Sequence, residues 1–200
     1  MDLDKINVKL FTKTDTFAPA EFVPIFHHWI QEQSLPGHLL IDVADYAHVP
    51  AGPGTLVVAS EANIHMDRTE NRLGLLYVRK QPIVGAATLH DRIRAVIAEA
   101  LHAAAKMQHE PECEGRLDFR TDEISIRFND RLLAPNTPET LAALKPAVEA
   151  VAKKLFANSP VTVELHDPSP LVLLDLRVKT NGSTTIEQLL ERAGAQSLSN

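Results

Sequence analysis

Apolar residues occupy every second position in two stretches of the chain, residues 6–10 and residues 124–128. This period of two predicts strands with one apolar and one polar face. After each stretch, a loop that ends in a proline leads into an apolar stripe of helical spacing, and two further apolar runs come next. The two halves of the chain therefore predict a similar order of elements.

Apolar residues spaced three and four apart predict the helices. The longest stripe covers residues 89–108, where Thr88 is expected to cap the helix and Asp91 to stabilise its first turn. Near the C-terminus, Thr184 and Glu187 have the spacing of a capping box and are expected to begin a last helix. The three long predicted helices span residues 20–33, 89–108 and 139–156.

Short apolar runs between polar or turn-forming residues predict further strands. These runs cover residues 38–43, 55–66, 73–79, 117–119, 161–165 and 171–178. The run at 55–66 is expected to form one continuous strand whose side chains alternate between two faces. One face is expected to carry Val58, Ser60, Ala62, Ile64 and Met66, and the other Glu61, Asn63, His65 and Asp67.

The summed order predicts an α+β protein made of two tandem β-α-β-β-type units, with helices packed on one side of mixed or antiparallel sheets. The first unit is expected to cover residues 1–110 and the second residues 116–200, as two domains or packed together as one. Two explanations of the repeated order stay open. One is a duplication related by a pseudo-twofold axis, and the other is a chance likeness of two α+β segments.

Composition and charge narrow the classes of partner. Of the 200 residues, 44% are hydrophobic and 23% charged, which is enough to bury a core. The formal net charge of -6 disfavours general affinity for nucleic acid or anionic lipid, which requires clustered Lys and Arg. No apolar run reaches the length of a membrane span, and the acidic N-terminus lacks the profile of a signal peptide. We therefore expect no nucleic-acid partner, no membrane partner and a cytoplasmic location.

The single cysteine, Cys113, limits the covalent and metal chemistry of one chain. One cysteine forms neither an intramolecular disulfide nor a cysteine-based zinc site. Its neighbours Glu112 and Glu114 are expected to raise the pKa of the thiol, which disfavours a thiolate nucleophile.

The segment after the first helix carries the candidate site. Asp42 stands within an otherwise apolar strand, and Asp45 and His48 follow in the next loop. Pairing with the long predicted strand is expected to bring them near its polar face. The candidate ligand-binding residues are Asp42, Asp45, His48, Glu61, Asn63 and His65. Among them, Asp42, Glu61 and His65 are candidate ligands of a divalent metal cofactor, since carboxylate and imidazole suit such ions.

A purely structural explanation of the same residues stays open. A strand with one polar face is typical of any half-exposed antiparallel sheet. Only Asp42 is unexpected in its apolar run, where a carboxylate is either exposed at the edge of the sheet or, if buried, requires a partner. The chain has neither a His-Glu-x-x-His motif nor a Gly-x-Ser-x-Gly motif.

Charged residues alternate with apolar ones in the second half of the chain. Asp175 and Arg177 lie on one face of a predicted strand, and Arg120 and Arg127 lie in another charged segment. We expect cross-strand ion pairs on a solvated face. An anion site around Arg120 and Arg127 is the alternative.

Three functional hypotheses follow from these patterns. Without a catalytic signature, a non-catalytic binding or assembly module is favoured, with a homo-oligomer and a small-molecule or anionic ligand as expected partners. The alternative is a metal-dependent enzyme, a hydrolase or lyase, that uses the Asp/Glu/His cluster. The third is an anion-binding regulatory domain that uses the loop at residues 50–54 with Arg68 or Arg72.

Overall fold

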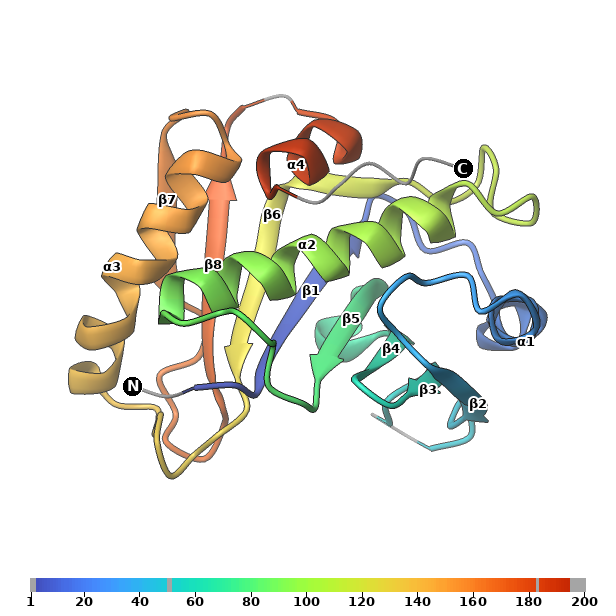
Figure 1. The fold of residues 1–200 in the computed structure, drawn as a ribbon, viewed down its shortest axis with the longest axis horizontal. Helices are drawn as coiled ribbons and strands as arrows, with labels where there is room; N and C mark the ends of the chain where they lie inside the picture. The colour runs from blue at the N-terminus through green and yellow to red at the C-terminus, as the bar shows by residue number, and fades with distance from the viewer. Residues whose placement is uncertain (1–2, 50–51, 183, 195–200) are drawn as a thin grey trace.

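The computed structural model describes residues 3–49, 52–182 and 184–194, which form an α+β fold (Figure 1). These residues contain eight strands, four α-helices and two short 3-10 helices. The strands are β1 (Ile6–Thr12), β2 (Leu40–Asp45), β3 (Thr55–Ala59), β4 (Ala62–Asp67), β5 (Gly74–Arg79), β6 (Phe119–Phe128), β7 (Val161–Leu165) and β8 (Leu174–Thr180). The helices are η1 (Pro19–Glu21), α1 (Phe22–Glu32), η2 (Thr69–Asn71), α2 (Leu89–Gln108), α3 (Pro138–Leu155) and α4 (Ile186–Arg192).

All eight strands belong to one sheet in the order β2-β3-β4-β5-β1-β6-β8-β7. Every neighbouring pair is antiparallel, so the sheet takes the antiparallel rather than the mixed form. Near its centre β1 pairs with β6, and Ile6 lies opposite Phe128. The first strands of the two predicted units therefore join both units in one continuous sheet.

Helices α2, α3 and α4 pack together over one face of the sheet (Figure 1). Helix α2 crosses β1 and β5, α3 lies along β7 and β8, and α4 contacts β6. Helix α1 packs against β2 and β3, and its Trp29 donates a hydrogen bond of 2.7 Å to Glu110, just after α2. No helix within the described residues is both long enough and apolar enough to cross a membrane.

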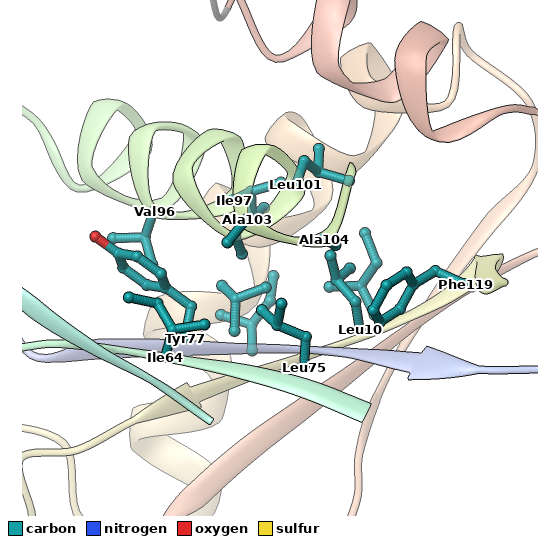
Figure 2. Packing of buried hydrophobic residues seen from close by; sticks show 14 of the residues in the cluster. Leu10, Ile64, Leu75, Tyr77, Val96, Ile97, Leu101, Ala103, Ala104 and Phe119 are labelled. Atoms are coloured by element: carbon teal, nitrogen blue, oxygen red, sulfur yellow. The ribbon is translucent and has the colours of Figure 1, made fainter. Parts of the chain in front are cut away.

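The apolar core lies between α2 and the strands beneath it (Figure 2). Ala100 and Ala104 of α2 are fully buried, and their small side chains let the helix approach the sheet closely. Each fully buried Leu, Ile or Phe contributes about 1.5–3 kcal/mol through removal from water. The buried residues labelled in Figure 2 are Leu10, Ile64, Leu75, Tyr77, Val96, Ile97, Leu101, Ala103, Ala104 and Phe119.

Helix α2 has the bounds that the sequence predicts, because its stripe and its cap agree. The hydroxyl of Thr88 accepts a hydrogen bond from the backbone N–H of Asp91 at 3.1 Å. The Asp91 carboxylate accepts in return from the backbone N–H of Thr88 at 3.2 Å. This capping box satisfies donors that the first helical turn leaves unpaired.

The prediction of one continuous strand at 55–66 is wrong. The segment forms the hairpin β3–β4, with its turn at residues 60–61. Because Val57 lies opposite Ile64, Val58 faces away from the side that Ile64 occupies. The sequence hides this turn for two reasons. Strand β3 is apolar on both faces, so no alternation of polar and apolar residues shows where it ends. The turn itself contains no Gly, Pro or Asn.

Two predicted short strands, 117–119 and 124–128, are also wrong as separate elements. Most of their residues belong to the single strand β6. The polar residues between them stay in the strand because they are paired: Arg120 donates to both carboxylate oxygens of Asp122, at 2.9 and 2.7 Å. Charged residues mimic a turn in the sequence, but ion pairing lets them lie in a sheet.

The last helix begins one position later than predicted. Its N-cap is Thr185, whose hydroxyl accepts from the backbone N–H of Gln188 at 3.3 Å. The side chain of Gln188 completes the capping box, which the sequence had assigned to Thr184 and Glu187. Both spacings satisfy the capping-box pattern, so sequence alone does not separate them.

Candidate functional site

The sheet face opposite α2 carries several buried charged side chains. Lys9 of β1, Ser125 of β6 and Arg177 of β8 lie opposite one another on three neighbouring strands. Lys9, Asp175 and Arg177 are 1%, 3% and 4% exposed, respectively. Buried charges are stable only with partners, so each of these residues requires a counterion.

Lys9 holds the loop between β4 and β5 against this face. Its ammonium group forms an ion pair with Asp67. It also donates to the backbone oxygens of Thr69 and Arg72, at 3.1 and 3.0 Å, and to the Thr69 hydroxyl at 2.9 Å. Burial lowers the pKa of Lys9, and the charge of Asp67 acts in the opposite direction. Lys9 therefore fixes the path of the loop.

This loop contains two consecutive non-glycine residues in the left-handed conformation, Glu70 with φ 65° and Asn71 with φ 55°. The conformation costs about 1–2 kcal/mol for a residue with a Cβ atom, although asparagine tolerates it better. Such strain persists where surrounding contacts impose it. The contacts of Lys9 before and after Glu70 supply that constraint.

The Glu70 carboxylate lies among three basic side chains. Nη2 of Arg177 donates to its two oxygens at 3.0 and 3.1 Å. Nε2 of His166 lies 3.4 Å from one oxygen, and Nη2 of Arg127 lies 3.9 Å from the same oxygen. We call Glu70, Arg127, His166 and Arg177 the Glu70 cluster.

Arg177 also pairs with Glu123, which connects the cluster to β6. Nη1 of Arg177 donates to Glu123 at 3.0 Å, and Arg72 donates to both Glu123 oxygens at 2.9 and 2.7 Å. Hydrogen bonds from Arg72 are the main cause that lowers the pKa of Glu123 to about 2. Burial opposes this shift, and Arg177 reinforces it. Glu123 is therefore held as a carboxylate.

The guanidinium of Arg177 is fixed on several sides. Burial acts to lower its pKa, but the hydrogen bonds with Glu70 and Glu123, together with the charges of Asp175 and Glu70, outweigh burial and raise it. Phe11 lies under both guanidinium groups, 4.9 Å from Arg177 and 3.7 Å from Arg72, measured to the ring centre. Nε of Arg177 is buried and has no hydrogen-bond acceptor among the described residues.

Arg127 and Asp175 form the cross-strand ion pair that the charge pattern predicts. They lie opposite each other on β6 and β8, and Nη2 of Arg127 is 3.0 Å from Asp175. The Ser125 hydroxyl donates to the other oxygen of Asp175 at 2.6 Å. We expected this ion pair on a solvated face, but it is largely buried, because the β4–β5 loop covers part of the pair.

A cavity of about 360 Å³ opens beside Glu70, and we call it the Glu70 cavity. Leu171, Val172 and Leu173 form an apolar wall, and Arg127 and His166 belong to a polar one. Its full lining is Thr69, Glu70, Arg127, Arg131, His166, Asp167, Leu171, Val172, Leu173 and Asp175. A concave site with an apolar wall and a few convergent polar groups is typical of small-molecule binding.

The β4–β5 loop separates this cavity from a second one of about 490 Å³, which we call the Tyr46 cavity. Tyr46 and Val49 of the β2–β3 loop and Arg68 contribute to its lining. Thr69 and Glu70 line both cavities. Residues 50–51, part of the loop in the third hypothesis, lie outside the described residues.

Three of the predicted site residues lie at the edge of the sheet. Asp42 is exposed on β2, and its carboxylate accepts from the backbone N–H of Val43 at 2.8 Å. Asp45 accepts from the backbone N–H of Ala47 at 2.9 Å. His48 is exposed in the loop that follows. Exposure explains how a carboxylate is accommodated in the apolar run around Asp42.

The other predicted site residues lie on or beside β4. Glu61 occupies the β3–β4 turn and accepts from the backbone N–H of Leu39 at 2.9 Å. Asn63 and His65 lie on the face opposite α2, where Nδ1 of His65 is 3.2 Å from the oxygen of Pro53. Burial lowers the pKa of His65. The ligand-binding role of these residues stays a prediction.

The structure does not bring Asp42, Glu61 and His65 together as a metal site. Within residues 3–49, 52–182 and 184–194, no group of three or more His, Cys, Asp or Glu side chains could hold a metal ion. Asp42 lies opposite Val58, whereas His65 lies opposite Leu56. The two residues are therefore on non-adjacent strands and at different register positions.

Sequence reasoning named two members of the Glu70 cluster. The charge pattern marked Arg127 as a candidate anion ligand and Arg177 as a residue of an ion pair, but it missed Glu70 and His166. Both missed residues lie in loops, where no periodicity marks them. One signal could have identified Glu70: it is an acidic residue between Arg68 and Arg72 in a short connection between two strands.

Searches against known protein families, curated proteins and solved structures found no match to this chain.

Proposed function

We propose that the protein is a non-catalytic binding module that holds a small organic molecule in the Glu70 cavity. The observation that carries the proposal is the meeting of the apolar wall at Leu171–Leu173 with fixed charged groups beside Glu70. The volume of about 360 Å³ lies at the lower end of the range for small-molecule sites. A small amphipathic molecule matches both walls.

Pre-organisation of the polar wall supports ligand binding. In the wall, Arg127 is held by Asp175. Behind the wall, Arg177 holds Glu70 and is itself held by Glu123 and by a cation–π contact with Phe11. A ligand that meets side chains already fixed in place loses less free energy to ordering them. Arg131 adds an exposed guanidinium that donates to the Leu171 backbone oxygen at 2.7 Å.

Edge pairing between copies of the chain is the less favoured role. Strand β2 lies at one edge of the sheet and exposes Ile41. However, the side chain of Gln33 bonds both backbone groups of Leu40, at 3.0 and 2.9 Å, and Asp42 bonds the N–H of Val43. Side chains that occupy backbone groups on an edge strand oppose pairing with another strand. These contacts favour ligand binding over assembly through β2.

A thermal-shift screen tests the proposal. Carboxylic acids, phosphate esters and amino acids of fewer than about 15 non-hydrogen atoms match the cavity in size. We expect at least one class to raise the melting temperature of the wild-type protein. Val172→Trp places a large side chain at the cavity wall and is expected to abolish that rise.

The matched control is Val84→Trp, which makes the same change at a fully exposed position outside the cavity lining. It is expected to retain the response of the wild type. A flat response of the wild type to every class argues against the proposal. An equal response of Val172→Trp and the wild type also argues against it, because binding would then occur elsewhere.

The sheet order also supports an internal duplication, which we infer as the origin of the fold. The series β1-α1-β4-β5-α2 corresponds to β6-α3-β7-β8-α4, with β2–β3 as an inserted hairpin. Both series place their strands in the sheet in the same way. From the β1–β6 pair outwards, the order is β1, β5, β4 in the first series and β6, β8, β7 in the second. A superposition of the two series about an axis between β1 and β6 tests this inference.

A further inference from the structure

We propose that the Glu70 side chain is an internal competitor that occupies the anion subsite of this binding module. The inference rests on the proposed function and adds the class of ligand, an oxyanion such as a carboxylate or a phosphate monoester attached to a small apolar group. The oxyanion takes the place of the Glu70 carboxylate among Arg127, His166 and Arg177.

The geometry around Glu70 is that of a bound carboxylate. One guanidinium nitrogen of Arg177 contacts both of its oxygens, at 3.0 and 3.1 Å. His166 and Arg127 approach one oxygen from other elements, at 3.4 and 3.9 Å. Charge-assisted bonds to several convergent donors are the usual mode of carboxylate and phosphate recognition.

The subsite has capacity that Glu70 does not use. Nε of Arg177 is buried without an acceptor among the described residues. Nε2 of His166, at 3.4 Å from the Glu70 oxygen, lies at the limit of hydrogen-bond distance, and Nη2 of Arg127, at 3.9 Å, lies beyond it. A free oxyanion is not tethered to a backbone, so it can adjust its position to these donors, and a phosphate also offers a third oxygen.

The loop is built so that Glu70 can leave while its neighbours stay in place. Lys9 holds the loop through Asp67, Thr69 and Arg72, which lie on either side of Glu70. Glu70 itself has the unfavourable left-handed backbone conformation, with φ 65°. Removal of its side chain from the subsite takes away a wall shared by the Glu70 and Tyr46 cavities.

Charge balance explains why a competitor is useful. Arg177 and Arg72 share the single carboxylate of Glu123, and Arg127 pairs with Asp175, so three guanidinium groups face only two carboxylates apart from Glu70. Without Glu70, the subsite would hold an excess of buried positive charge when empty, which is unfavourable. The internal carboxylate stabilises the empty state. It also lowers the apparent affinity for the oxyanion, because only the fraction of molecules in which Glu70 has left the subsite can bind.

The test is a titration of Glu70→Gln and wild-type protein with phenyl phosphate at fixed ionic strength, followed by backbone amide NMR. The variant removes the internal charge but keeps a similar shape. We expect it to bind phenyl phosphate at least about tenfold more tightly than the wild type, because it no longer competes as an anion. Glu70→Asp, which keeps the charge, is expected to stay within about threefold of the wild type.

The matched control is Glu187→Gln on α4, which removes one exposed acidic charge on the opposite side of the sheet. It is expected to leave the affinity unchanged within about twofold, because exposed charges are screened. Equal affinities of Glu70→Gln and the wild type, with shifts at residues that line the Glu70 cavity, overturn the competitor and leave the proposed function standing. Binding by neither protein contradicts both.

A measurement on the wild type alone covers the case in which Glu70→Gln does not fold. Saturation with phenyl phosphate is expected to shift the amide signals of Glu70 and Asn71 more than that of Gly85, a remote loop residue. Shifts at Arg127 without any change at Glu70 and Asn71 overturn the inference, because the loop would then not have responded.

Discussion

Nη2 of Arg177 lies 3.0 and 3.1 Å from the two carboxylate oxygens of Glu70, although the residues are 107 positions apart in the sequence. The contact joins β8 to the loop between β4 and β5, and so connects the two halves of the chain across the face opposite α2. Because Arg177 also pairs with Glu123, one guanidinium links the proposed site to the stability of the sheet.

The first prediction concerns Glu123, whose pKa falls from 4.5 to about 2 mainly through its hydrogen bonds with Arg72. A carboxyl whose pKa is lower in the folded state stabilises the fold above its unfolded pKa, and this stabilisation is lost as the pH falls through the folded value. Glu123→Gln is expected to lower the free energy of unfolding by about 3–5 kcal/mol at pH 7. The difference from the wild type should shrink as the pH falls from 4.5 towards 2.

Urea denaturation at a series of pH values measures this difference. Glu164→Gln serves as the control, since its exposed pair with Lys179 is expected to contribute less than about 1 kcal/mol. A loss for Glu123→Gln that is the same at pH 7 and pH 3 would contradict the assigned ion pair.

The second prediction concerns Lys9, which is the cation for the buried Asp67. Lys9→Met keeps most of the side-chain volume but leaves the carboxylate of Asp67 buried without a cation. We expect a loss of about 3–5 kcal/mol in the free energy of unfolding. The double variant Lys9→Met with Asp67→Asn is expected to recover part of this loss, because it removes the uncompensated charge. A double variant no more stable than Lys9→Met would argue against the pair.

The third prediction compares two glycines with positive φ angles. A Cβ atom at Gly54, with φ 71°, would lie 2.2 Å from the backbone oxygen of Met66. A Cβ atom at Gly85, with φ 84°, would have nothing within 4 Å. Both alanine variants carry the cost of the left-handed conformation, about 1–2 kcal/mol, and Gly54→Ala is expected to lose a further 1–3 kcal/mol or so through the clash. Equal stabilities in chemical denaturation would be inconsistent with this packing.

The fourth prediction concerns Cys113, which is fully buried. Burial, with help from Glu110 and Glu112, raises the pKa of its thiol to about 12. Because the thiolate is the reactive form, labelling by a thiol reagent at pH 8 is expected to be slow in the native protein and fast in urea. The rate at which an aromatic disulfide reagent releases its coloured thiol measures the labelling of the native and of the unfolded protein. Rapid labelling of the native protein would show that the thiol is accessible.

The elements that the sequence predicts best are those where two local signals agree. Helix α2 combines a long apolar stripe with the Thr88–Asp91 capping box, and its predicted bounds are confirmed. Strand β6 lacked such agreement, because its charged middle resembles a turn until its ion pairs are known. The β3–β4 turn was missed because a buried apolar strand runs into it without a turn residue.

The proposed site was less predictable than the fold. The charges of Arg127, Asp175 and Arg177 show in the strand alternation, which predicts cross-strand ion pairs, but only the structure shows that β6 and β8 are the strands that pair. Glu70 depends instead on how Lys9 positions a loop, and this relation involves residues distant in sequence. Periodicity describes one element at a time, so it does not predict which loop covers a sheet face.

A crystallographic screen with small carboxylates, phosphate esters and amines tests the central claim most directly. The account predicts that bound molecules gather in the Glu70 cavity, with an oxyanion against Arg127 and an apolar group against Leu171 or Val172. Molecules that bind at other surfaces and leave this cavity vacant, at concentrations that saturate those surfaces, would contradict the account.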